Sequence, residues 1–434
     1  MIIVLLFVLM FLLMAMGLPI ALAIGLPAIG LIITPGVFPD TIAFSALGQT
    51  VVQQLFSGID SFDLLAVPLF MIAGSIMEVG GISRRLIDFC DSLVGWAHGG
   101  LAAAAIVASM IIAGISGSAA ADTAAIGAVV IPAMIRQGYP PPFAAAVVAA
   151  GGSIGIIIPP SIPMVIFGFM TNISTSQLFA GGMMVGILLG LSFIVVAVVV
   201  SWRKGYGVRE EFSWARVLST GRAAAFSLGA PVVILGGILS GVVTVTEAAA
   251  LAVFYALLVG TVVNRELPWK ELPALIIKSQ VAAAGILFII AMAKIFGWLL
   301  AMQQGAKVLD LFVNSLALPP TGLLLLIMGL LLVIGCVMET TAALLLVVPV
   351  LALLTPQMQV DPVQFGVLVV VNLAIGMMTP PVGICLFVSC GIAEVSLGRI
   401  SVAVMPLVAA AMIDLLIACL WPPLTMWLPT LLYR

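Results

Sequence analysis

Residues 117–132, GSAAADTAAIGAVVIP, carry the pattern that decides the fold, and SIGIIIPP follows them at 153–160. A related stretch, GCVMETTAALLLVVP, occupies 335–349, and AIGMMTPP follows it at 374–381. Both stretches place an acid and a threonine inside apolar sequence, followed further on by a glycine and two prolines. Because this unusual order occurs twice, the sequence predicts a duplicated structural unit.

The spacing of the two copies supports the duplication. Asp122 and Glu339 hold matching places 217 positions apart, and the two Pro-Pro pairs are 221 positions apart. Upstream of them, LFMIA at 69–73 recurs as LFIIA at 287–291, an offset of 218. Three blocks in the same order at nearly one spacing indicate two repeats of one unit.

The composition is that of a membrane protein. Of the 434 residues, 64% are hydrophobic and 7% are charged, whereas soluble domains carry about 25% charged residues. Apolar runs such as 182–200 approach the roughly 20 residues that a spanning helix needs, and we predict an all-α polytopic bundle with ten or more crossings. The five cysteines form no CxxC pair and no cluster with histidine, so we expect no transition-metal site. For a protein of this class we also expect no cofactor and no nucleic-acid partner.

The basic residues indicate the orientation of the chain. They gather at Arg84 and Arg85, at Arg136, at 203–222 and at 265–278, and by the positive-inside rule these positions mark the cytoplasmic side. The LFMIA segment precedes its basic pair, Arg84 and Arg85, whereas the LFIIA segment follows its basic residue, Lys278. We therefore predict that the repeats cross the membrane in opposite directions, as in secondary transporters with sites near the midplane.

The predicted organisation has scaffold helices around two repeats. Outside the repeats we expect N-terminal scaffold helices at 1–63, a cytoplasmic basic loop at 201–222, scaffold helices at 223–278 and a C-terminal helix at 399–434. The first repeat, 64–200, is expected to hold a re-entrant hairpin at about 101–136 and a broken helix at about 143–172. The second repeat, 279–398, is expected to hold a hairpin at about 320–355 and a broken helix at about 363–393.

The proline and glycine breaks predict ion sites. Irregular backbone at membrane depth is tolerated where it is buried in protein or lines a polar cavity, and proline frees an upstream carbonyl oxygen. A helix kink would explain each break taken alone, but the pairing of both breaks with hydroxyls and acids favours sodium sites. We expect the first site at Ser116, Ser118 and the break 155–160, and the second at Gly335, Thr340, Thr341 and the break 376–381.

Two acids inside these apolar stretches have two open interpretations. Asp122 and Glu339 each follow a predicted hairpin tip, where a carboxylate can cap the returning helix. A charge within the membrane is also costly, which makes each a candidate for substrate binding or ion coupling, together with Ser153 and Asn372.

Three further charged residues lie in apolar sequence. Glu247 follows Thr244 in TVTEAAA and is expected to cap a helix start. We expect Asp414 and Lys294 to be internal pairing or interface residues.

Four motifs together resemble one transporter family. They are GxSGSxxAD at 114–122, GGSIGxxIPPSIPMVIxG at 151–168, TEAAA at 246–250 and NLxxGMxTPPVGxxLFV at 372–388. The chain resembles the large membrane subunit, of the DctM type, of tripartite ATP-independent periplasmic (TRAP) transporters. Because no four-helix segment precedes the first repeat, it resembles the unfused version. One departure is Val245, where the family commonly has the proline of TPTEA.

The resemblance implies a sodium-driven elevator transporter of the bacterial inner membrane, built from two inverted repeats. It implies one sodium site at Ser116, Ser118, Gly155, Ile158 and Pro160. A second site would use Gly376 and Thr379 with the second hairpin tip. It also implies two partners, a small four-helix membrane subunit and a periplasmic binding protein that delivers a small carboxylate and largely sets its identity.

Other functions remain open at this point. A sodium/anion symporter or an ion antiporter of related architecture would work without a binding protein. An intramembrane aspartyl protease would need a carboxylate pair, but the second acid is a glutamate and neither acid stands in a GxGD setting, so we expect no enzyme. A passive channel fits broken repeats less well than a carrier does.

Overall fold

The computed structural model describes residues 2–34, 37, 44–207 and 212–433. These residues form helices and connecting turns and contain no strand, which confirms the all-α prediction. Among them, eight helices are long and apolar enough to cross a membrane, or nine if the bent pair at 63–94 counts as one span. The ten or more crossings that we predict exceed this number, which leaves out the apolar helices of 10–17 residues formed where breaks divide several apolar stretches.

The N-terminal apolar stretch forms two short helices. Helix α1 (Ile2–Ala15) and helix α2 (Ile20–Ile33) are separated at Gly17, whose φ is +81°, and at Pro19, the N-cap of α2. The left-handed conformation favours glycine, and proline cannot continue the hydrogen bonding of α1. The two helices pack on each other, and α2 also packs on the long helix α13 (Leu272–Met302).

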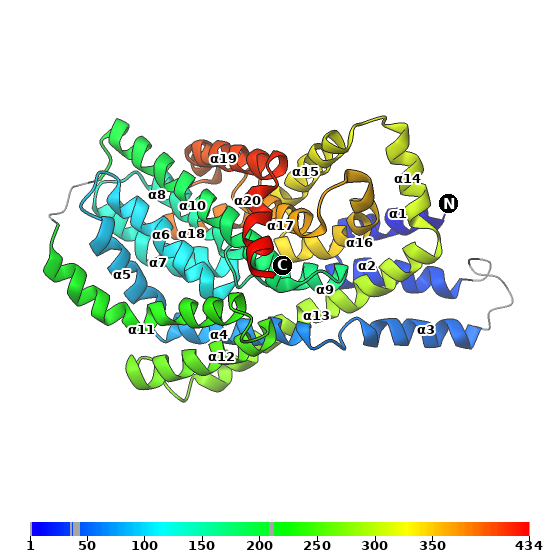
Figure 1. The fold of residues 1–434 in the computed structure, drawn as a ribbon, viewed down its shortest axis with the longest axis horizontal. Helices are drawn as coiled ribbons and strands as arrows, with labels where there is room; N and C mark the ends of the chain where they lie inside the picture. The colour runs from blue at the N-terminus through cyan, green and yellow to red at the C-terminus, as the bar shows by residue number, and fades with distance from the viewer. Residues whose placement is uncertain (1, 35–36, 38–43, 208–211, 434) are drawn as a thin grey trace.

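A row of helices forms the lower edge of the molecule in Figure 1. It contains α3 (Phe44–Ser57), α4 (Ala66–Val79), α11 (Trp214–Leu239), α12 (Val245–Leu258) and α13. Helix α4 carries LFMIA and α13 carries LFIIA, and these two helices pack against each other. The short helices η1 (Asp63–Leu65) and η3 (Val259–Val263) adjoin α4 and α12.

The remaining elements repeat in one order. The first series is α5 (Ile82–Val94), α6 (Gly100–Ser116), α7 (Ala119–Arg136), α8 (Pro141–Ser153), η2 (Ile154–Ile156), α9 (Ile162–Thr171) and α10 (Thr175–Lys204). The second series is α14 (Gly305–Ser315), α15 (Pro320–Val337), α16 (Thr340–Met358), α17 (Pro362–Met377), α18 (Ile384–Ala393) and α19 (Leu397–Leu420), and α20 (Pro423–Tyr433) ends the chain.

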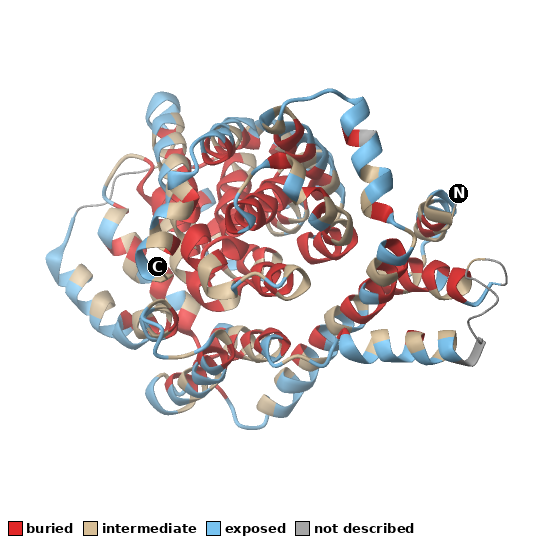
Figure 2. Ribbon diagram, turned by 45° about the vertical axis from the view of Figure 1, so that its right-hand side comes forward, coloured by how far each residue is buried: buried red, intermediate tan, exposed pale blue. Residues whose placement is uncertain are grey.

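The two series interlock at the centre of the protein. Helix α9, which follows the first break, packs against α16 of the second hairpin, and α18, which follows the second break, packs against α7 of the first. Helices α8 and α17 are buried from Phe143 to Ser153 and from Val363 to Met377. Figure 2 shows buried residues concentrated in this interior. Both hairpin tips and both breaks therefore face a common core.

Two predicted segments differ from the structure. Most of the predicted basic loop at 201–222 is helical, because α10 continues to Lys204 and α11 begins at Trp214, where the Ser213 side chain accepts a hydrogen bond from Arg216 N. Arg209, which lies in the same stretch, is outside the described residues. The C-terminal segment forms two helices, α19 and α20, because Pro422 and Pro423 interrupt it.

Candidate functional site: a pocket between two hairpin tips

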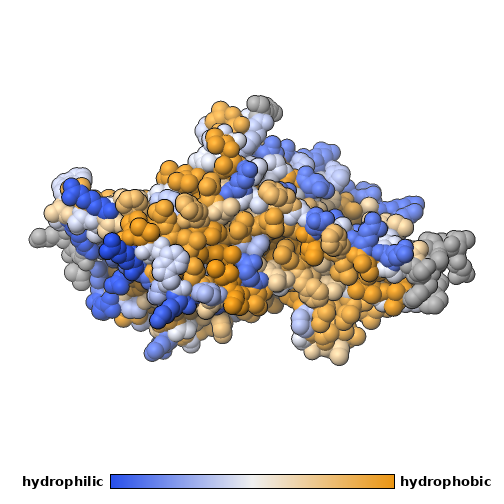
Figure 3. Space-filling view, turned by 90° about the horizontal axis from the view of Figure 1, so that it is seen from below, coloured by the Kyte–Doolittle hydropathy of each residue, from blue (hydrophilic) through white to orange (hydrophobic). Residues whose placement is uncertain are grey.

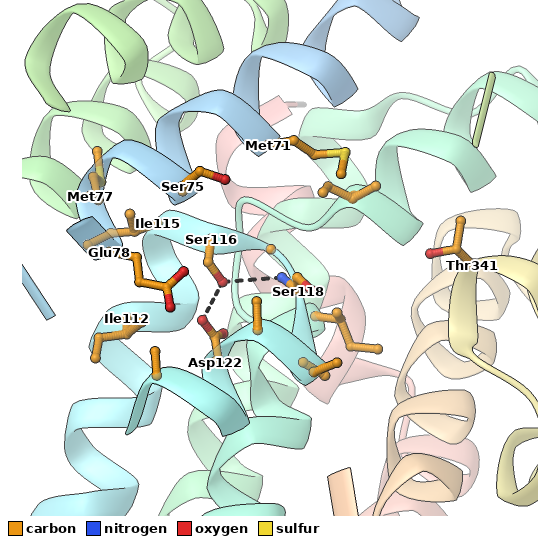
Figure 4. Close-up of a pocket in the computed structure, with 18 of the residues that line it drawn as sticks. Met71, Ser75, Met77, Glu78, Ile112, Ile115, Ser116, Ser118, Asp122 and Thr341 are labelled. Carbon is orange, nitrogen blue, oxygen red and sulfur yellow. Dashed lines mark hydrogen bonds between the residues drawn. The ribbon is translucent and has the colours of Figure 1, made fainter. Parts of the chain in front are cut away.

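A cavity of about 340 Å³ lies where the first hairpin tip faces α4 and the second hairpin. Its described lining contains three carboxyl groups and no basic side chain. Figure 4 shows the Glu78 carboxylate turned toward Ser116 and Asp122, with Thr341 on the far side. The polar side chains that line the cavity are those of Ser75, Glu78, Ser83, Ser116, Ser118, Asp122, Glu339 and Thr341.

The first tip is a two-residue turn held against the first break. Gly117 has φ +65°, in the left-handed region that favours glycine. A Cβ atom at this position would lie 2.8 Å from the carbonyl oxygen of Pro160 and 3.3 Å from Ile162 N. The turn therefore contacts the break at backbone distance, and Ser116 and Ser118 flank this contact.

Asp122 is buried beneath this turn, with 1% of its surface exposed. Its Oδ1 accepts a hydrogen bond from Ser116 Oγ, which itself accepts one from Ser118 N at 3.2 Å (Figure 4). Its other oxygen, Oδ2, has no hydrogen-bond partner among the described residues. A Cβ atom at Gly155 would collide with this oxygen, so Oδ2 lies directly against the break.

Glu339 has a different role, although it occupies the matching place in the sequence. It is the N-cap of α16: its Oε2 accepts from Ala342 N at 3.0 Å and its Oε1 from Thr341 Oγ1 at 2.9 Å. Helix α7 begins at Ala119, three residues before Asp122, and the Asp122 carboxylate bonds to Ser116 instead of a backbone N–H of α7. Glu339 therefore caps α16 by hydrogen bonds, whereas Asp122 lies in the first turn of α7 without a capping hydrogen bond from its carboxylate among the described residues.

The second tip also meets its own break. A Cβ atom at Gly376 would lie 2.5 Å from the carbonyl carbon of Gly335, so α15 and α17 touch at backbone distance. Thr340 Oγ1 lies 2.9 Å from Met377 Sδ. Thr379 Oγ1 donates to the carbonyl oxygen of Ile375 at 2.7 Å, which leaves the hydroxyl oxygen able to accept.

Several predicted site residues lie outside the cavity lining. Ser153 is buried and donates to the carbonyl oxygen of Ala150 at 2.7 Å, and its Oγ lies 3.5 Å from Met378 Sδ of the other break. Asn372 is buried and donates to the carbonyl oxygen of Met328, while its Oδ1 has no partner among the described residues. Also outside the lining are Gly155, Ile158, Pro160, Gly335, Thr340, Gly376 and Thr379.

Glu78 is the site residue that the sequence reasoning missed. It lies near the end of α4, a few residues before Arg84. In the sequence, an acid at this position has the pattern of a solvent-exposed residue at the end of a helix. The sequence feature that could have identified it is the single acid between LFMIA and the basic pair at Arg84 and Arg85. Only the approach of α4 to the first hairpin brings this acid to Asp122.

The other charged residues in apolar sequence have individual explanations. Glu247 forms a capping box with Thr244, as predicted, and Val245 in place of the family's proline does not prevent it. Asp414 accepts a hydrogen bond from Ser192 Oγ at 3.1 Å, which joins α19 to α10. The ammonium of Lys294 lies 5.9 Å from the ring centroid of Phe169.

Comparison with known proteins agrees with the motifs in this site. The family described as the tripartite ATP-independent periplasmic transporter, DctM component, matches residues 7–424. The chain belongs to this family. It is therefore a multi-pass permease of a TRAP transporter of the bacterial inner membrane, not an enzyme.

Three relatives illustrate the similarity. The C4-dicarboxylate TRAP transporter large permease protein of Pseudomonas aeruginosa is 38% identical over 391 residues, 90% of each chain. The sialic acid TRAP transporter large permease protein of Vibrio cholerae is 36% identical over 379 residues, 87% of this chain and 89% of that one. The isethionate TRAP transporter permease protein DctMQ of Oleidesulfovibrio alaskensis is 38% identical over 412 residues, 95% of this chain but only 64% of that longer protein.

The fold also resembles a solved structure. The YdaH transporter of Alcanivorax borkumensis superposes with a TM-score of 0.67, covering 93% of this chain and 97% of that one, at 14% identity. At that identity the likeness concerns the arrangement of helices alone.

Proposed function

We propose that this permease imports a small organic acid, delivered by a periplasmic binding protein, and that a sodium gradient drives the import. Relatives that carry the names of C4-dicarboxylates, sialic acid and 2,3-diketo-L-gulonate support the class of substrate. All three are organic acids, although they differ in size and hydroxylation, so the solute of this protein is not fixed by its family.

The observation that carries the proposal is the charge of the central pocket. Glu78, Asp122 and Glu339 line it, and none of its described lining residues is basic. A carboxylate substrate entering alone would meet like charges in a medium of low dielectric, which is strongly unfavourable. Bound cations would reverse this balance, so the pocket favours coupled entry of sodium and an organic acid.

The first tip offers a suitable donor set for sodium. The serine oxygens of Ser116 and Ser118 and the carbonyl oxygen of Pro160 border one turn. Oδ2 of Asp122, which has no hydrogen-bond partner in the described part of the chain, lies beside this turn. With the backbone of Gly155 and Ile158, these groups supply the oxygens that a hard cation prefers. We assign Asp122 the coupling role, since a buried carboxylate oxygen without a donor is costly until a cation approaches it.

The second sodium site would lie at the matching contact between Gly335 and Gly376. Thr340, Thr341 and Thr379 supply hydroxyl oxygens near this contact. Here Glu339 caps α16 and is not proposed as a sodium ligand. The first site would therefore contain a carboxylate and the second would not, although both belong to matching parts of the two repeats. Ser153 and Asn372 would stabilise the helix packing around the breaks through their buried hydrogen bonds and would not contact the substrate.

The proposed transport step moves the interlocked hairpins past the row that contains α4 and α13. The lining of the pocket includes Glu78 and Ser83, which are close in sequence to Arg84 on the predicted cytoplasmic side, and this supports our assignment of the conformation as inward-facing. Inverted repeats account for an alternate outward-open state by exchanging the conformations of the two halves.

The outer surface of the row suits the bilayer and the small four-helix subunit. Val232 of α11, Phe254 of α12 and Val281 of α13 have 70%, 65% and 68% of their surfaces exposed. Figure 3, seen from below, shows hydrophobic side chains spread over this face.

Reconstitution tests the proposal. The permease, the small subunit and candidate binding proteins are placed in liposomes, and uptake of organic acids is measured under an imposed sodium gradient. We expect accumulation against the solute gradient that requires both sodium and the binding protein. Accumulation without a binding protein would instead support the independent symporter, and uptake only down the solute gradient would support a channel.

A further inference from the structure

A second cavity, of about 280 Å³, lies at the junction of α3, α9, α13 and α16. Most of its lining is apolar, with Phe169 from α9, Ile290 from α13 and Val348 from α16. Three side chains with hydrogen-bonding groups line it as well, those of Lys294, Gln54 and Trp298. It shares none of its lining residues with the pocket between the hairpin tips.

Lys294 is the unusual member of this lining. It belongs to a 31-residue helix that is apolar enough to cross the membrane, and its side chain is exposed in the structure. Its ammonium faces the ring of Phe169, and within the described part of the chain no carboxylate forms an ion pair with it. An ammonium group within the membrane carries a large desolvation cost, and the cation–π contact with Phe169 offsets only part of it. A bound anion would offset more.

The position of Lys294 along α13 indicates its depth. It lies eight residues before the end of the helix at Met302, about 12 Å at 1.5 Å per residue. The other end of α13 carries Lys278 on the predicted cytoplasmic side. Lys294 therefore lies toward the outer leaflet, within reach of the level of the lipid headgroups.

The chemistry of the lining selects one kind of ligand. The lining combines the ammonium of Lys294 and the polar groups of Gln54 and Trp298 with otherwise apolar walls, which suits a ligand that has an anionic group and an apolar chain. We propose that the cavity binds an anionic phospholipid, whose phosphate meets Lys294 and Gln54 while an acyl chain covers Phe169, Ile290 and Val348. A bound lipid would join α13 to α9 and α16 and so stabilise the packing between them.

Lipid-dependent thermal unfolding tests this site in the purified permease with its small subunit. Phosphatidylglycerol, phosphatidylcholine and inorganic phosphate are titrated separately, and the midpoint of unfolding is followed. We expect phosphatidylglycerol to raise the midpoint of the wild-type protein well above the effect of the other two. An equal effect of inorganic phosphate would overturn the lipid assignment in favour of a free anion.

Variants locate the effect. Lys294→Met should weaken the apparent affinity for phosphatidylglycerol by about fivefold or more, and Lys294→Arg should retain it. Lys278→Met, on the same helix but outside the cavity, is the matched control and should behave as wild type. Ala352→Phe fills the cavity from α16 while keeping the charge, and should also lower the affinity.

Equal phosphatidylglycerol affinity in the wild type, Lys294→Met and Ala352→Phe would overturn the proposal. An equal loss in Lys294→Met and Lys278→Met would also overturn it, because that result indicates a general attraction to the protein surface. Binding is read without transport, so the outcome does not depend on sodium coupling.

Discussion

Asp122→Asn is the substitution that most directly separates ion coupling from helix capping. Asn keeps an oxygen for the Ser116 hydroxyl, but it places an NH2 donor where Oδ2 now faces Gly155. Glu339→Gln is the matched control, since it removes a carboxylate from the same pocket and keeps an acceptor for Ala342 N.

The expected magnitude follows from the burial of Asp122. Removing one partner of a buried charge pair costs about 3–5 kcal/mol, and Asp122 is 1% exposed with no other cation near it among the described residues. Sodium binding at the first tip should therefore weaken by about 10²–10⁴-fold. Glu339→Gln should change it far less, because the Glu339 carboxylate already accepts two hydrogen bonds.

Two measurements check this difference. Uptake into proteoliposomes as a function of sodium concentration gives the apparent sodium affinity of each variant. The rise in unfolding temperature on adding sodium gives binding without transport, and it also reports whether each variant is folded. An Asp122→Asn protein with the sodium response of the wild type would refute the coupling role, as would equal losses in both variants.

Three further outcomes are expected. Gly117→Ala should lower the free energy of unfolding by about 1–3 kcal/mol, because φ is +65° and the new Cβ atom would lie against backbone atoms. Thermal unfolding measures this change, and Gly236→Ala, where a Cβ atom meets open space, is the control. Equal stability of the two variants would contradict the prediction. Thr244→Ala should cost about 1 kcal/mol through loss of the capping box, and an unchanged midpoint of unfolding would show that the cap contributes nothing. Cysteine in place of Arg136 should react with an impermeant maleimide only from the cytoplasmic side, and one in place of Pro356 only from outside; the reverse labelling would overturn the inverted topology.

The sequence by itself determined the class of the protein and the positions of its breaks. An apolar chain with few charges must lie in a membrane, and its backbone must be helical there because no water satisfies the peptide groups. Proline and glycine end helices through local geometry, so the interruption of both repeats could be predicted from IPPSIP and TPPVG. The duplicated motifs also identified the family, since they are local patterns that a single sequence displays in full.

Tertiary structure decided what the matching residues do. Asp122 and Glu339 are 217 positions apart in an exact repeat of pattern, yet one lies inside its helix against Gly155 and the other caps its helix. The cause is where each hairpin turns, at Gly117 in the first copy and at Met338 in the second, and that depends on how the hairpin packs against its break.

The partners of charged residues were likewise beyond the reach of sequence. Glu78 lines the same cavity as Asp122, and Lys294 lies over the ring of Phe169, only because helices that are separate in the chain pack together. Local sequence fixes where a helix can begin and end, because those preferences act within a few residues. Which atoms meet across the core is set by the packing of whole helices. In this permease the packing leaves Asp122 Oδ2 beside a break without a hydrogen-bond partner among the described residues, and it places Glu339 as the cap of α16.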